Sequence, residues 1–182
     1  MLLMKKIIAI TLFSSILTHA FAQNEKKVRT CLFTEYNKTI YDRTSGNNPW
    51  GVGLGLQFFL NNKTKFKPTI EISGDIYLAD NKVLKLNTDG TIPVPYNDAR
   101  GMINLFAGCV FYPASNIYIS FAAGPALING QTLLAVKPSF GFHFSKSKKW
   151  AGKISYLNIF NRDKITKEDF GSISVAIGVK IF

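Results

Sequence analysis

Charged side chains within otherwise apolar segments are the first candidates for chemistry in this sequence. They are Glu71, Asp75, Lys137, Lys153 and Lys180. An isolated charge is costly to bury, whereas charges that are paired and hydrogen-bonded are tolerated. We expect Glu71 and Lys137 at a similar depth. We therefore predict one ion-pair network that fills a protein interior, in preference to a conducting or gating site.

Residues for metal or cofactor chemistry are scarce. His143 is the single histidine after position 22, and the two cysteines, Cys31 and Cys109, are far apart in the sequence. These residues cannot supply the clustered nitrogen and sulfur ligands that zinc favours. The glycines of segment 51–55 recur at every second position, which is a strand pattern and not a phosphate-binding loop. The sequence predicts no metal site and no cofactor.

The first 22 residues have the pattern of an export signal. Lys5 and Lys6 precede an apolar stretch over 7–17, and Ala20-Phe21-Ala22 follows it. This order is typical of a signal peptide that is cleaved before Gln23. The apolar stretch is shorter than the ~20 residues that a membrane-spanning helix needs. We predict a signal peptide over 1–22 and one mature domain over 23–182.

The mature sequence alternates apolar with small or polar residues at every second position, which is the period of a β-strand. In segment 171–182 the apolar face carries Ile173, Val175, Ile177 and Val179. Similar alternation predicts strands over 50–60, 66–78, 102–112, 117–127 and 132–144. Segments 28–37 and 150–161 alternate less cleanly, so the phase of these two strands stays open. We expect Cys31 and Cys109 to be free, because their strands are not neighbours.

The connections between these strands alternate in length. Segments 61–65, 113–116 and 145–149 are short, whereas 38–49, 80–99 and 162–169 are long, with an exception near residues 129–131. Short turns on one side and long loops on the other are typical of outer-membrane barrels, which keep both termini in the periplasm. We predict an all-β, eight-stranded, antiparallel up-and-down transmembrane barrel. Its lumen would be filled by side chains, with no wide pore.

The chain is strongly basic, with a formal net charge of +11. Export makes nucleic acid an improbable partner. The lysines of the short turns would either attract anionic lipid head groups of the inner leaflet or only keep the turns soluble. The sequence leaves both interpretations open.

The signal peptide, the eight amphipathic strands, the short inner turns and the terminal Phe182 together resemble the small OmpA/OmpX-like outer-membrane barrels. The Ala20-Phe21-Ala22-Gln23 junction and the glycine-rich strands resemble the barrels of Bacteroidota, including the PorT-like group. The resemblance covers 23–182. It implies an outer-membrane location in a Gram-negative cell envelope, contact with outer-membrane lipids and with the outer-membrane assembly machinery, and a structural, adhesive or secretion-accessory role.

Two alternatives to this interpretation remain. His143 and Ser145 are similar to the His and Ser of lipid A deacylase barrels, but the orienting Glu of those enzymes is missing, because Leu157 and Asn158 occupy that region. We therefore predict no enzyme. The other alternative is a soluble, exported lipocalin-like barrel, with its apolar faces turned inward around a small hydrophobic ligand.

The longest loop contains a stiff, partly apolar stretch. It consists of Ile92, Pro93, Val94, Pro95 and Tyr96. This stretch would suit contact with a protein partner, although proline also stiffens loops that contact nothing.

Overall fold

The computed structural model describes residues 28–41, 50–61, 64–78, 99–128, 130–144, 147–161 and 169–181. The predicted signal peptide and the stretch 92–96 lie outside these residues. The strands are β1 (Val28–Tyr41), β2 (Trp50–Leu60), β3 (Phe66–Leu78), β4 (Ala99–Phe111), β5 (Ile117–Ile128), β6 (Gln131–His143), β7 (Trp150–Ile159) and β8 (Phe170–Lys180). No helix in the described part of the chain is long and apolar enough to cross a membrane.

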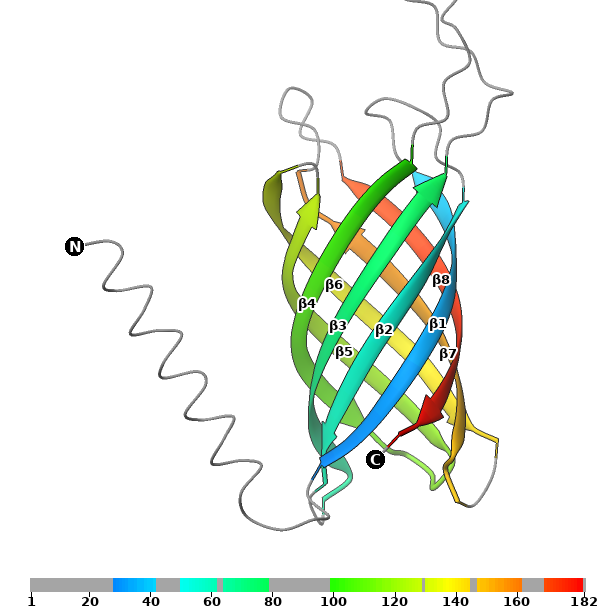
Figure 1. Ribbon diagram of the computed structural model, residues 1–182. Helices are drawn as coiled ribbons and strands as arrows, with labels where there is room; N and C mark the ends of the chain where they lie inside the picture. Colours follow the sequence, from blue (N-terminus) through cyan, green and yellow to red (C-terminus); the bar gives the residue numbers. More distant parts are fainter. Residues whose placement is uncertain are drawn as a thin grey trace, which may run out of the picture.

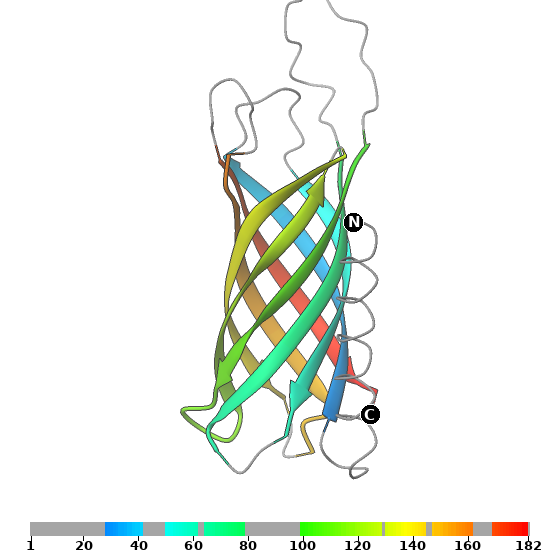
Figure 2. The ribbon, with the colours of Figure 1, turned by 90° about the vertical axis from the view of Figure 1, so that its left-hand side faces the viewer.

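All eight strands form one closed antiparallel sheet (Figures 1 and 2). Each strand pairs with its neighbours in sequence, and β8 pairs with β1 through partners such as Val175 and Tyr36. Because sequential strands are neighbours throughout, the barrel has up-and-down topology. The predicted fold class is confirmed.

The two ends of the barrel differ. β1 begins and β8 ends at the same end, which we call the terminal rim, and the connections after β2, β4 and β6 lie there too (Figure 1). At the opposite end, which we call the distal rim, β1, β3 and β7 end and are followed by the longer segments 42–49, 79–98 and 160–169. The expected separation of short and long connections is therefore present.

Side chains sort by chemistry across the sheet. In β8, Val175 and Ile177 are 54% and 56% exposed on the outer face, whereas Ser174 and Ala176 are 5% and 2% exposed on the inner face. Large apolar side chains cover the outside of the other strands as well, among them Leu54, Ile103 and Phe121. This arrangement contradicts the lipocalin-like alternative, because that interpretation requires the aliphatic residues to line the interior.

The two strands of open phase depart from simple alternation. The inner face of β1 carries Phe33 together with Glu35, and the inner face of β7 carries Leu157 and Ile159 together with Lys153. Both strands thus place apolar and charged side chains on the same face. Polar and apolar residues therefore do not alternate cleanly along β1 and β7, although both strands have a regular backbone.

The interior is filled in layers. Apolar side chains that include Tyr77, Met102 and Phe170 pack toward the distal rim. A second apolar cluster, which includes Phe59 and Tyr118, packs toward the terminal rim. Polar and charged side chains lie between the two clusters, as the next subsection describes. Eight strands leave room for side chains and no more, so this filling is expected.

Gly178 makes room for the buried ring of Phe33 in β1. It pairs with Phe33 across β8 and β1, and a Cβ atom at position 178 would clash with the Phe33 ring. Extra atoms in a packed interior typically cost about 1–3 kcal/mol. We expect Gly178→Ala to lower the free energy of unfolding by about that amount, measured by urea unfolding of the barrel in detergent micelles.

Gly101 provides the matched control, because a Cβ atom added there on the outer face meets nothing within 4 Å. Gly101→Ala should leave the free energy of unfolding nearly unchanged. The double variant Phe33→Leu/Gly178→Ala should recover part of the loss. Equal losses for the two glycine variants would show that lumen crowding is not the cause.

Candidate functional site

Four charged side chains meet in the middle of the lumen. They are Glu35 of β1, Glu71 of β3, Lys137 of β6 and Lys153 of β7, and each has at most 4% of its side chain exposed. We call this group the central network. It joins strands from opposite sides of the barrel, because inward side chains of all strands converge on the axis.

Each lysine of the central network contacts both glutamates. The Lys137 Nζ atom lies 3.0 Å from an oxygen of Glu35 and 2.6 Å from one of Glu71. The Lys153 Nζ atom lies 3.4 Å from Glu35 and 3.0 Å from Glu71. It also lies 4.5 Å from the centre of the Phe33 ring. Two positive and two negative charges balance, which offsets the cost of removing them from water.

The central network contains three of the side chains that the sequence singles out, Glu71, Lys137 and Lys153. Sequence analysis missed Glu35, because the neighbouring inward position of β1 holds Phe33 and the polarity pattern is unclear there. Charge balance is a signal that would have found it. The predicted set contains three lysines and only two carboxylates, so charge balance calls for one more acid, and Glu35 is the one acidic residue of the predicted strand 28–37.

Asp75 lies next to the central network in a separate polar group. Its carboxylate accepts hydrogen bonds from Asn37 Nδ2 at 2.7 Å, Asn104 Nδ2 at 2.9 Å and Ser73 Oγ at 3.2 Å. Among the described residues, these amide and hydroxyl donors take the place of a cation. Asp75 is thus buried in the lumen, as expected, but hydrogen bonds rather than an ion pair hold it.

Lys180 does not belong to the central network, and this part of the prediction is wrong. Its side chain is exposed at the terminal rim, where its backbone N–H donates to the Lys149 carbonyl at 2.7 Å. Lys180 has the alternation parity of an inward residue. It is nevertheless the last residue of β8. At the end of a strand, an inward-facing position is open to solvent and is not enclosed by the barrel.

The remaining candidate residues stand apart from the central network. His143 lies at the terminal rim, with its ring 5.4 Å from that of Tyr118 and 6.2 Å from that of Tyr112. Ser145, its proposed partner in catalysis, lies outside the described residues. Cys31 is buried in the lumen, Cys109 is exposed on the outer face, and both are free.

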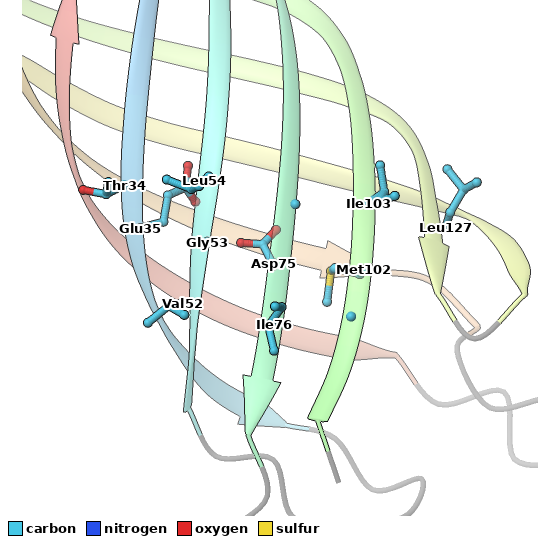
Figure 3. A pocket seen from close by; sticks show the side chains of 12 residues that line it. Thr34, Glu35, Val52, Gly53, Leu54, Asp75, Ile76, Met102, Ile103 and Leu127 are labelled. Atoms are coloured by element: carbon cyan, nitrogen blue, oxygen red, sulfur yellow. The ribbon is translucent and has the colours of Figure 1, made fainter.

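A shallow hollow of about 860 Å³ opens on the outer wall over β2, β3 and β4 (Figure 3). Gly74 and Gly101 leave its floor without side chains. Outward aliphatic residues border it, namely Val52, Leu54, Ile76, Ile103 and Leu127. Glu35 and Asp75 also line it, but their carboxylates are already held in the lumen by Lys137 and by Asn37. A hollow bordered mainly by aliphatic side chains suits lipid chains more than a reaction.

Solved structures of membrane barrels share this fold. The crystal structure of Ail, the attachment invasion locus protein of Yersinia pestis, aligns with a TM-score of 0.54 over 87% of this chain and 100% of that chain, at 13% identity. Ail in complex with the heparin analogue sucrose octasulfate aligns with a TM-score of 0.55 over 85% and 98%, at 11% identity. This chain is a small outer-membrane-type β-barrel.

A de novo designed transmembrane β-barrel also aligns with this outer-membrane-type barrel, with a TM-score of 0.51 over 87% of this chain and 100% of the design, at 7% identity. No protein-family model and no curated protein sequence matches the chain. The resemblance to small OmpX-like barrels is thus confirmed for the fold. The finer resemblance to Bacteroidota and PorT-like barrels stays a prediction.

Proposed function

We propose that this chain is an integral outer-membrane protein that acts as a closed anchor. The terminal rim faces the periplasm in this proposal, and the distal rim faces outward. The barrel holds the segments that follow β1, β3 and β7 at the cell surface, in a structural or adhesive role. The observation that carries the proposal is a lumen filled by side chains, with a charge-balanced central network, inside an apolar outer wall.

The outer wall supports a position in lipid. Exposed aliphatic side chains, for instance Val175 and Ile177, cover its middle. An apolar surface of this extent is unfavourable in water and is typical of a membrane or protein contact. Aromatic side chains gather toward the terminal rim, where Phe66 stacks on Phe111 with centroids 4.7 Å apart. Trp150 and Phe144, 49% and 57% exposed, lie at the same rim. Aromatic girdles at the membrane interfaces are typical of outer-membrane barrels.

The central network supports a closed lumen. Its four side chains cross the barrel between two apolar clusters, and the glutamates and lysines use one another as partners. A substrate would have to break these contacts before it bound there. We therefore propose that the lumen neither conducts nor catalyses, and that activity resides at the surface.

The distal segments are the proposed contact region. Ail, which shares the fold, carries attachment in its name and has been crystallised with a heparin analogue, and this supports an adhesive role by analogy. Residues Ile92, Pro93, Val94, Pro95 and Tyr96 belong to the longest segment and form the proposed partner stretch. A secretion-accessory role is a second candidate, and it rests on the PorT-like resemblance.

Replacement of the longest distal segment tests the anchor proposal. We expect a variant in which Asn-Gly replaces residues 79–98 to fold, because β3 and β4 pair directly from Leu78↔Ala99 onward. On intact cells, we expect this variant to crosslink to fewer partner proteins than the wild type does. Pull-down and mass spectrometry identify the partners. The control replaces residues 162–168 in the same way. Identical partner sets for all three proteins would remove segment 79–98 from the proposed contact region.

A further inference from the structure

A second group of charged residues lies at the terminal rim, where five strands bring their ends together. It comprises Arg29 of β1, Lys67 of β3, Tyr112 after β4, Tyr118 of β5, His143 of β6, and Lys148 between β6 and β7. We call it the rim cluster. The central network uses none of these residues.

The rim cluster is built around the ring of Tyr112. The Lys148 Nζ atom lies 5.1 Å from the ring centre, the Lys67 Nζ atom 6.0 Å and the Arg29 guanidinium carbon 5.7 Å. Arg29 also donates a hydrogen bond to the Tyr112 hydroxyl. Three cationic side chains therefore converge on one small region. Cation–π contacts position them there, but each such contact contributes only about 0.5–2 kcal/mol and neutralises no charge.

Several polar atoms of the rim cluster are buried without a hydrogen-bond partner in the described part of the chain. They are the Arg29 Nε atom, the Tyr118 hydroxyl and one ring nitrogen of His143, whose other ring nitrogen faces the Trp150 backbone. Arg29, Tyr118 and His143 are 7%, 0% and 4% exposed, respectively. A buried donor without a partner typically costs about 1–3 kcal/mol. Packing does not require such a cost, and a ligand with acceptor oxygens would remove it.

The charges of Arg29 and Lys148 are not balanced by the described acidic residues in the way that those of the central network are. Of the four acidic residues that the structure describes, Glu35 and Glu71 pair with lysines of the central network. Asp75 accepts from Asn37, and Asp169 accepts from Asn158 near the distal rim. None of these four forms an ion pair with Arg29 or Lys148. The pKa of Lys148 lies below its usual value because burial disfavours the charged form, and because Arg29 and Lys67 add positive charge.

We propose that the rim cluster is a binding site for a phosphate-type oxyanion. The guanidinium group of Arg29 and the ammonium group of Lys148 supply charge-assisted donors, and the Tyr118 hydroxyl and the His143 ring supply further donors. Phosphate oxygens accept several such hydrogen bonds at once. Arg29 closes the inner side of the site, whereas the half-buried Lys148 lies on the side that opens to solvent.

Free phosphate, or a phosphate ester, and the phosphate of a lipid head group share this chemistry. A lipid source rests on the proposed function, which places the terminal rim at the inner leaflet of the outer membrane. The experiment separates the two sources by lipid composition.

His143 provides the signal for the test, because it is the single histidine of residues 23–182. Protein isolated from membranes with isotope-labelled histidine is incorporated into nanodiscs of a neutral glycolipid that contains no phosphate. Inorganic phosphate then replaces chloride stepwise, so that the ionic strength stays constant. We expect a saturable change in the NMR signals of the His143 ring. A second set of nanodiscs contains phosphatidylglycerol and no added phosphate. The same change there, before any titration, would identify a lipid head group as the source.

Lys148→Asn and Lys149→Gln form the matched pair of variants. Lys148 has a φ of 54°, and asparagine tolerates this conformation, so the variant removes a charge without backbone strain. We expect Lys148→Asn to weaken binding about tenfold, as the loss of one charge-assisted donor predicts. Lys149, which is exposed in the same turn, loses the same charge, and Lys149→Gln should change the affinity by no more than about twofold.

Three outcomes would contradict a proposal made here. Signals of His143 that stay unchanged in both kinds of nanodisc would overturn the rim site, and this includes the case in which a carboxylate of the chain itself fills it. Equal weakening by the two lysine variants would also overturn it, because a diffuse charge effect would then explain binding. Failure of the wild-type chain to enter nanodiscs would instead contradict the proposed membrane location.

Discussion

Replacement of Lys137 by glutamine is expected to lower the free energy of unfolding by about 3–5 kcal/mol, because it leaves two buried glutamates to share one lysine. Lys137 lies 3.0 Å from Glu35 and 2.6 Å from Glu71, and its side chain is 3% exposed. The remaining ammonium group, that of Lys153, cannot neutralise both carboxylates. Urea unfolding of the barrel in detergent micelles, followed by tryptophan fluorescence, measures the change.

The double variant Glu71→Gln/Lys137→Gln separates charge balance from simple loss of contacts. It removes one charge of each sign and leaves the pair formed by Glu35 and Lys153, which are 3.4 Å apart. We expect it to be more stable than Lys137→Gln alone, although two groups have changed instead of one. Planar-bilayer recordings of the same variants should show current only where the central network is broken. Unchanged stability and unchanged single-channel behaviour in both variants would refute the central network as a lumen plug.

The exposed Lys149 provides the control for the Lys137 experiment. Lys149→Gln makes the same chemical change outside the lumen, where an unpaired surface charge contributes little. Its free energy of unfolding should stay within about 0.5 kcal/mol of the wild type. A comparable loss in both lysine variants would mean that net charge, and not burial, sets the effect.

The strands could be predicted from sequence where one property alternated without interruption. The bounds of β2 and β3 match the predicted segments 50–60 and 66–78, because outward Leu, Ile and Val residues alternate there with inward glycine or polar residues. β1 was predicted to end at Asn37 and extends to Tyr41. Beyond Asn37 the pairing with β8 continues, and partner strands are not visible in a local pattern.

The central network could be predicted in part, because a charge within an apolar segment has to find a partner. Glu71, Lys137 and Lys153 stood out for that reason. Glu35 did not, since Phe33 shares its face and hides the phase of β1. Lys180 was assigned to the lumen by parity alone, and parity carries no information about where a strand leaves the barrel.

The rim cluster could not be predicted from the sequence, because its members are far apart in the chain and each is unremarkable alone. Arg29 and Tyr112 are 83 residues apart, yet they share a hydrogen bond. Barrel closure brings the beginning of β1 across the lumen toward the ends of β4 and β6. Only in the closed barrel do three cationic side chains contact the ring of Tyr112. Sequence analysis saw the excess of lysine in the turns but not its convergence on the lumen.

The orientation of the sheet faces makes the membrane location testable at a single position. Val175 lies in the middle of β8, pairs with Tyr36 and Ile154, and is 54% exposed. If this face contacts lipid, Val175→Arg should lower the free energy of unfolding from liposomes by about 2–4 kcal/mol, the usual cost of an arginine at mid-membrane depth in a β-barrel. If it contacted water, arginine would change the stability by no more than about 0.5 kcal/mol.

Ala114→Arg is the matched control for this prediction, because Ala114 is exposed in the turn at the terminal rim, where an arginine stays in contact with water and head groups. It should unfold like the wild type. The two variants introduce the same side chain and charge, so the difference between their free energies of unfolding reports the effect of depth in the bilayer. Because an inserted arginine at position 175 has no lumen to enter and no acidic partner on the described outer face, its cost measures the lipid environment directly. Equal stability of the two variants would contradict a lipid-facing outer wall.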